Sequence, residues 1–205
     1  MISQVVRDEL APSGILRVGI NYGNPVLVRR DAGSGELSGV AVDLARELGW
    51  RCELAVELVG FEAAGKMTGA LKAGAWDVAF LAAEAGRAGE IAFTAPYLLI
   101  EGTYLLPPGS PIQSIDEVDR AGVRVGMSTG SAYELFLRRN MHQAQMVQAG
   151  SPNSTFNLLI DGKVDVLAGV RQTLVANAAK LPGARVFDER FMAIGQAMGM
   201  PHGRP

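Results

Sequence analysis

Short apolar runs with strand character alternate with helix-like runs along the first half of this chain. Residues 15–20 (ILRVGI), 54–59 (LAVELV) and 76–81 (WDVAFL) are predicted strands, and the runs at 40–50 and 63–73 are predicted helices. Strands that alternate with helices are joined by crossovers, which produce a mostly parallel sheet with right-handed connections. The first half is therefore predicted to fold as an α/β unit.

The same alternation restarts in the second half. Its strands and helices are predicted, in turn, at residues 122–127, 131–140, 146–149, 153–161, 164–168, 171–180 and 184–187. We find no internal repeat of residues, so the two halves are alike in pattern rather than in sequence. The chain is predicted to hold two Rossmann-like α/β lobes.

Two extended apolar runs stand where the chain would pass between these lobes. Residues 97–106 (YLLIEGTYLL) precede two prolines, and residues 191–200 (FMAIGQAMGM) lie near the end. Two lobes joined by two hinge strands can close on a ligand held between them. We expect these boundaries: lobe 1, residues 14–100 with 195–205; lobe 2, residues 101–194.

Charge and hydropathy exclude several classes of partner. The net charge is −2, so no surface for nucleic acid or an anionic membrane is expected. No run of 18 apolar residues predicts a membrane span. The N-terminus, MISQVVRDELAPS, lacks the pattern of a secretory signal, so the chain either stays in the cytoplasm or begins after a processing site. Cys52 is the single cysteine and is predicted to be a buried structural thiol.

Two motifs resemble enzyme signatures and fail on inspection. Residues 60–68 (GFEAAGKMT) nearly match a phosphate loop, but Met67 stands where a hydroxyl must hold magnesium. Residues 126–130 (GMSTG) spell G-x-S-x-G, but His142 follows too soon and His202 lies in the tail. The histidines lack metal-ligand spacing, so neither a metal nor a cofactor is predicted.

Three polar segments follow predicted strands and form the candidate site. Thr129, Gly130 and Ser131 begin a helix, where free amides and the positive dipole end suit a carboxylate; simple N-capping is the alternative, and both can hold. Arg87 follows the strand at 76–81, where a guanidinium can grip a carboxylate in two parallel hydrogen bonds; a surface ion pair with Glu84 or Glu90 is the alternative.

Asn21, Tyr22 and Asn24 follow the first strand. Two amides and a phenol can hydrogen-bond and stack on a small polar solute, although Asn, Gly and Pro also form ordinary turns.

Taken together, these residues resemble the family 3 extracellular solute-binding proteins, the polar amino-acid receptors of ABC importers. The resemblance spans roughly residues 14–205. It is carried by the segments LRVGINYGNPVL, GELSGVAVDLAREL, VRVGMSTGSAYELFL and IDGKVDVLAGVRQ, and most strongly by residues 74–97, which end in RxxEIAFTxPY.

The resemblance implies a periplasmic binding protein-like II fold, a periplasmic location, an ABC permease as partner and no catalysis; we expect a monomer. It implies that Arg87 binds the ligand carboxylate, that the loop 130–132 shares this task, and that Tyr22 packs on the ligand. Two alternatives remain: a cyclohexadienyl dehydratase-like enzyme with Glu84 or Glu101 as general acid, and a sensor module of a receptor.

Three departures from the family pattern bear on the ligand. Residues 169–172 (GVRQ) lack the acid that usually neutralises a ligand ammonium, unless Glu84 supplies it. Arg171 instead suggests a second anionic group, as in a dicarboxylate or an acidic amino acid; a solvated helix-start arginine is the alternative. Glu84 also falls where the family usually has a hydroxyl, and Pro205 ends the chain before the C-terminal helices expected from the family.

Overall fold

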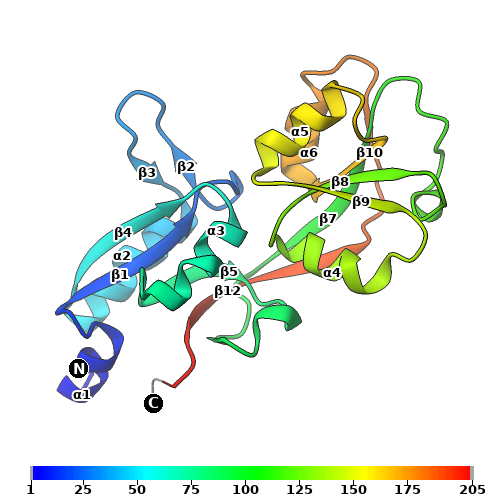
Figure 1. Cartoon of the computed structure of the whole chain (residues 1–205). Coiled ribbons are helices and arrows are strands. Elements are labelled where there is room, and N and C mark those ends of the chain that lie inside the picture. Colours follow the sequence, from blue (N-terminus) through cyan, green and yellow to red (C-terminus); the bar gives the residue numbers. More distant parts are fainter. Residues whose placement is uncertain (1, 204–205) are drawn as a thin grey trace. The chain divides into compact units, whose positions relative to one another are not determined.

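The computed structural model describes residues 2–203 and divides into two compact units. Unit 1 runs to Leu98 and resumes at Gln196, and unit 2 is Leu99–Gly195. The chain changes unit inside two long strands, β7 (Leu98–Leu106) and β12 (Met192–Pro201), which we call the crossing strands (Figure 1). The predicted α/β fold class is confirmed.

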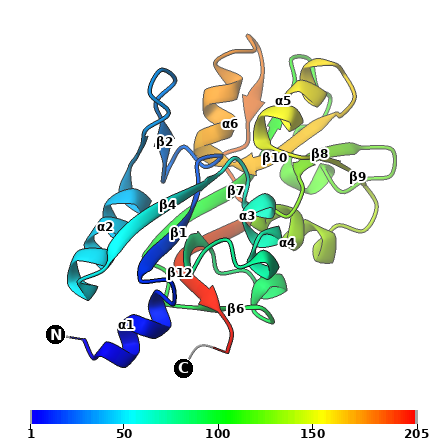
Figure 2. The same cartoon turned by 60° about the vertical axis from the view of Figure 1, so that its left-hand side comes forward.

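Unit 1 contains three parallel strands in the order β4-β1-β5, with β12 antiparallel beside β5 and β6 beside β12. A small hairpin, β2–β3, stands apart from this sheet (Figure 2). The bounds are α1 (Gln4–Leu10), β1 (Ile15–Asn21), β2 (Arg29–Arg30), β3 (Leu37–Ser38), α2 (Val40–Cys52), β4 (Ala55–Phe61), α3 (Ala64–Gly69), β5 (Val78–Ala82) and β6 (Ile91–Phe93), with 3₁₀ turns at Leu71–Ala73 and Ala85–Arg87.

Unit 2 repeats this arrangement. Strands β9, β8 and β10 are parallel in that order, and β7 runs antiparallel beside β10. The bounds are a 3₁₀ turn at Ile115–Glu117, β8 (Arg124–Ser128), α4 (Ala132–Asn140), β9 (Gln145–Ala149), α5 (Pro152–Ile160), β10 (Val166–Val170), α6 (Arg171–Ala178) and β11 (Arg185–Val186).

The two units start their sheets with the same ion pair. Arg17 of β1 donates three hydrogen bonds to the carboxylate of Asp77, the residue before β5. The donors are the backbone amide (3.1 Å), Nε (3.0 Å) and Nη2 (2.8 Å). Arg124 of β8 donates to the carboxylate of Asp165, the residue before β10, from the same three groups: the backbone amide (2.8 Å), Nε (3.0 Å) and Nη2 (2.7 Å). The Arg17–Asp77 pair therefore fixes the register of β1 and β5, and the Arg124–Asp165 pair fixes the register of β8 and β10.

Apolar side chains fill a separate core in each unit. In unit 1, Leu16, Val18 and Ile20 of β1 are fully buried, and in unit 2 Leu105, Leu167 and Leu174 pack together. The period-two pattern of β1 and the uninterrupted apolar run of β5 explain the core of unit 1, because β5 is covered on both faces.

The structure corrects the helix predicted at 63–73 and shows the surroundings of Lys66 and Cys52. The helix predicted at 63–73 is interrupted at Ala70, where α3 ends and a 3₁₀ turn begins. Lys66, in the failed phosphate loop, pairs on the surface with Glu62. Cys52 is a buried free cysteine, and burial raises the pKa of its thiol.

Candidate functional site

The candidate residues of unit 1 lie at one edge of its sheet. Asn21 ends β1, and Glu84 and Arg87 follow β5, the parallel neighbour of β1. Because the carboxyl ends of parallel strands share an edge, the structure places these residues on the same side of unit 1, where α/β proteins bind ligands.

The two asparagines support the turn itself. The Asn21 side-chain oxygen accepts from the Gly23 amide at 3.0 Å, and the Asn24 oxygen accepts from the Val26 amide at 3.3 Å. Asn24 is 8% exposed. Their amide oxygens therefore act as turn-forming groups, the simpler of the two expected roles.

Tyr22 continues past β1 beside the end of β4, since its amide donates to the Phe61 carbonyl at 2.9 Å. Its ring packs on Gly60, where a β-carbon would approach ring carbon Cε1 to 3.3 Å. The guanidinium of Arg30, from β2, lies over the ring at 5.0 Å from its centroid. The aromatic surface at this edge thus carries a cation, an attraction that the ring quadrupole favours.

Arg87 ends the 3₁₀ turn after β5 and is 5% exposed. Its Nη1 donates to the Ala82 carbonyl at 2.9 Å, and the Glu84 carboxylate accepts from the Gly86 amide at 2.6 Å. Burial lowers the pKa of Arg87 to about 10, and the nearby Glu84 charge opposes this shift. The guanidinium therefore remains charged at neutral pH, buried at the edge of the unit 1 sheet where its parallel strands end.

The helix start of unit 2 is capped by its own residues. The Ser131 hydroxyl accepts from the Glu134 amide at 3.1 Å, and the Thr129 amide donates to the Ala149 carbonyl at 2.9 Å. Gly130 has φ +69° and donates its amide to the Glu134 carboxylate at 3.2 Å. N-capping, the alternative expected for this loop, is present.

A buried carboxylate already occupies the positive end of α4. Glu134 is 1% exposed and accepts from Arg138 Nε at 2.9 Å and from Gln148 at 2.7 Å. The first-turn amides of Ala132 and Tyr133 have no partner within the helix, as in any α-helix. Sequence reasoning missed Glu134, although an acid three residues after a serine cap is a capping signal.

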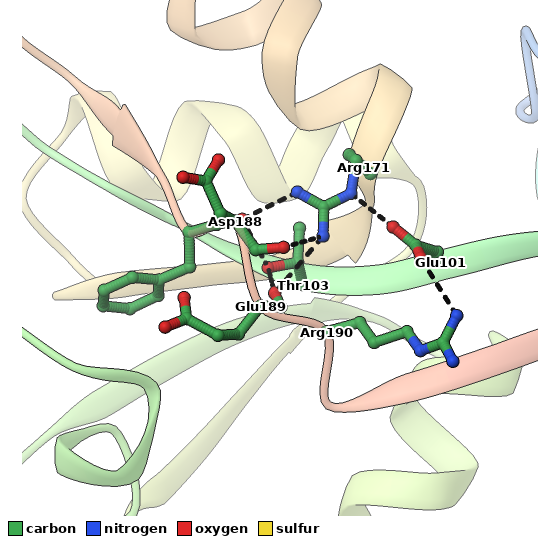
Figure 3. Close-up of polar contacts among 7 residues, drawn as sticks. Glu101, Thr103, Arg171, Asp188, Glu189 and Arg190 are labelled. Carbon is green, nitrogen blue, oxygen red and sulfur yellow. Dashed lines mark hydrogen bonds and ion pairs between the residues drawn. The ribbon is translucent and has the colours of Figure 1, made fainter.

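Arg171 has partners that neither of its expected roles included. It is the first residue of α6, and its Nε donates to Glu101 at 2.6 Å (Figure 3). Its terminal nitrogens donate to the carbonyls of Phe187 (2.7 Å) and Asp188 (2.7 Å). The guanidinium is thus bound within unit 2 rather than solvated.

Glu101 is held by two arginines. Arg190 Nη1 lies 3.0 Å from the second carboxylate oxygen. The hydrogen bond from Arg171 is the main cause that lowers the pKa of Glu101, so this carboxylate is ionised at neutral pH.

Among residues 2–203, no cluster of three or more His, Cys, Asp or Glu could hold a metal, and no helix is long and apolar enough to cross a membrane.

The family model of the bacterial extracellular solute-binding proteins, family 3, matches residues 16–153. The chain belongs to this family. Among curated proteins, none matches the sequence significantly.

Solved structures share the fold of this family 3 protein at 18–20% identity. The ancestral amino acid-binding protein AncCDT-1, a precursor of cyclohexadienyl dehydratase, has a TM-score of 0.78 at 20% identity over 98% of this chain and 87% of its own. Holo ArgBP from T. maritima has 0.80 at 20% over 95% and 86%. The substrate-binding protein of an amino acid ABC transporter has 0.79 at 18% over 93% and 86%.

Proposed function

We propose that this protein is the substrate-binding component of an ABC importer that takes up a small polar solute bearing a carboxylate, an amino acid or a related compound. The observation that carries the proposal is the buried Arg87 guanidinium at the carboxyl end of β5. A buried cation at this edge favours a small anion, because the pair is screened little by water. The solved structures that share the fold include an amino acid-binding protein and the substrate-binding protein of an amino acid transporter, which supports the same ligand class.

In this proposal the ligand is gripped by groups from both units, which close about the crossing strands. Unit 1 contributes Arg87 and the Tyr22 ring, and unit 2 contributes the α4 start at Ser131. Arg171 is left out, because its donors serve Glu101 and backbone carbonyls. The second anionic group expected from Arg171 therefore loses its support, while Arg30 beside Tyr22 adds a cation to unit 1.

The importer role carries further proposals. We expect a monomer that works outside the cytoplasmic membrane and delivers its solute to an ABC permease. Fractionation of cells that produce the protein from its native gene tests the location, and light scattering after gel filtration tests the monomer.

A thermal-shift screen of amino acids and dicarboxylates tests the ligand class, because a specific binder raises the melting temperature by mass action. Calorimetry then compares the wild type with Arg87→Ala and with Arg185→Ala as control. Arg185 belongs to β11 and donates to the Ile112 carbonyl at 2.8 Å. We expect the Arg87 variant to lose at least tenfold in affinity and the control to bind normally; equal affinities would remove Arg87 from the site.

An enzyme on the same fold is the second candidate, supported by the likeness to AncCDT-1, a dehydratase precursor. Elimination needs a protonated acid near the ligand. Glu101 is poorly suited, because its lowered pKa keeps it ionised; Glu84 remains as the candidate. Incubation with prephenate or arogenate and a search for the product decides between binding and catalysis.

A further inference from the structure

The two crossing strands meet a compact polar cluster inside unit 2. Glu101 lies on β7, two residues after the change of unit at Leu99, and Arg190 lies just before β12. Arg171 enters from α6 and joins the cluster (Figure 3). Three elements distant in sequence therefore converge where the chain enters and leaves unit 2.

The Arg171 guanidinium links these elements directly. Nε binds Glu101 of β7 at 2.6 Å, and Nη1 and Nη2 bind the Phe187 and Asp188 carbonyls at 2.7 Å each. Nη2 also lies 3.3 Å from the Glu189 carbonyl. Since a guanidinium presents its donors in a rigid fork, these bonds hold residues 187–189 at a fixed distance from β7.

Hydrogen bonds along β7 fix the same segment from its other side. The Thr103 hydroxyl contacts the Glu189 carbonyl at 2.6 Å and the Phe187 carbonyl at 3.2 Å. The Phe187 amide donates to Tyr104 at 3.1 Å, and the Phe191 amide donates to Gly102 at 3.0 Å. The segment before β12 is thus bonded to β7 at both ends.

Aromatic packing completes the joint. The Phe191 ring lies 4.6 Å from Tyr104 and 6.1 Å from Phe136 of α4, measured between centroids. At Gly102, an added β-carbon would stand 3.0 Å from the Phe191 ring and from Met192. The absence of a side chain at position 102 lets the start of β12 lie close against β7.

The position of Arg171 is costly for its own helix. A cation at a helix N-terminus opposes the macrodipole, and Val170 provides no side-chain cap for α6. The Glu101 carboxylate and the backbone carbonyls compensate the charge. Helix formation alone therefore does not account for an arginine here, whereas joining the crossing strands does.

We propose that Arg171 and Glu101 are positioning residues that clamp the two crossing strands together inside unit 2. The clamp confines the bending of a closure motion to residues 98–100 and 195–196, on the unit 1 side of the cluster. The inference rests on the proposed function, since closure on a ligand is what gives a localised hinge its use.

Hydrogen exchange by NMR tests the clamp without any ligand. In Arg171→Met we expect the Phe187 and Phe191 amides to exchange at least tenfold faster, while the Met127 amide of β8 keeps its rate. Glu101→Gln loosens the same two amides to a smaller extent and decides the question if the arginine variant does not fold. Arg124→Met, which removes an arginine–carboxylate pair of unit 2 that lies outside the cluster, is the matched control and leaves both amides at the wild-type rate.

Distance measurement between spin labels adds a readout that a purely stabilising role would not change. Labels at Ser34→Cys and Lys163→Cys, in a Cys52→Ala background, report one residue of each unit. We expect a broader distance distribution in Arg171→Met than in the wild type or in Arg124→Met. Unchanged exchange at both amides, equal acceleration in the control, or an unchanged distribution overturns the clamp. If no amino acid or dicarboxylate of the thermal-shift screen raises the melting temperature, the proposed function is contradicted instead, and neither measurement of the clamp uses a ligand.

Discussion

Asp165 accepts three hydrogen bonds from Arg124, two from the guanidinium and one from the backbone amide. The Asp165 amide returns a bond to the Arg124 carbonyl at 2.8 Å. Unit 1 contains the same set of four hydrogen bonds between Arg17 and Asp77. The same kind of ion pair thus fixes the register of β1 with β5 in unit 1 and of β8 with β10 in unit 2.

The two aspartates should differ in their effect on stability. The Asp77 side chain is fully buried, whereas that of Asp165 is 39% exposed. We expect Asp77→Asn to lower the free energy of unfolding by about 2–3 kcal/mol, because the buried amide that replaces the carboxylate no longer accepts charge-assisted hydrogen bonds from Arg17. Asp165→Asn should cost only about 1 kcal/mol. Urea unfolding of both variants measures the difference, and equal losses would contradict it.

Protonation of Asp165 at low pH should lower the free energy of unfolding. The hydrogen bonds from Arg124 hold the pKa of this carboxyl below its ordinary value, against the opposing effect of burial. A carboxyl with a lowered folded-state pKa adds stability above its unfolded pKa of about 3.9 and loses it as the pH falls through the folded value. We expect the unfolding free energy to fall below pH ~4, less steeply in Asp165→Asn. Arg124→Met should flatten the profile similarly, and an unchanged slope in both variants would refute the linkage.

Two helical glycines should respond oppositely to alanine. At Gly49 in α2, a β-carbon would stand 2.2 Å from Val56 Cγ2, whereas at Gly69 in α3 it would meet nothing within 4 Å. Gly69→Ala should stabilise the protein by about 0.5–1 kcal/mol through helix propensity. Gly49→Ala should destabilise it by about 1–3 kcal/mol, because overpacking outweighs propensity. Thermal unfolding of the pair provides the measurement; stabilisation by both would show that α2 shifts freely on β4.

Ligand affinity should depend on the charge of Arg87. Burial lowers the pKa of this guanidinium to about 10, so it loses its proton at lower pH than an exposed arginine. A bound carboxylate favours the charged form, and affinity should therefore fall up to about tenfold per pH unit above pH ~10. Calorimetry from pH 8 to 11 on the best compound of the thermal-shift screen checks this. A constant affinity across that range would mean that another group holds the carboxylate.

Periodicity predicted most of the regular structure. The strands at 15–20, 122–127 and 146–149 lie within two residues of β1, β8 and β9, because apolar strand runs bounded by Gly or polar residues are strong signals. The short elements α1, β2–β3 and β6 were not predicted. Two- and three-residue strands carry too little pattern, and α1 buries no residue.

The candidate site was harder to read, because partners distant in sequence decide what a side chain does. Arg171 and Glu101 are 70 residues apart, so spacing gave no sign of their ion pair. The pairing of Arg17 with Asp77 and of Arg124 with Asp165 did leave a signal. RVGI lies in β1 and RVGM in β8, while WDV leads into β5 and VDV into β10, a correspondence that a search for longer repeats overlooks.

The return of the chain through β12 has a consequence for biosynthesis. Strand β5 pairs with residues 196–199, and β6 with residues 199–201, which a ribosome makes only after the whole of unit 2. Unit 2 is an uninterrupted segment and can fold as soon as it emerges. Unit 1, in contrast, keeps an open edge on β5 until unit 2 has been made, and an unpaired strand edge invites association with other chains. Nascent unit 1 is therefore the part of this protein most in need of a chaperone.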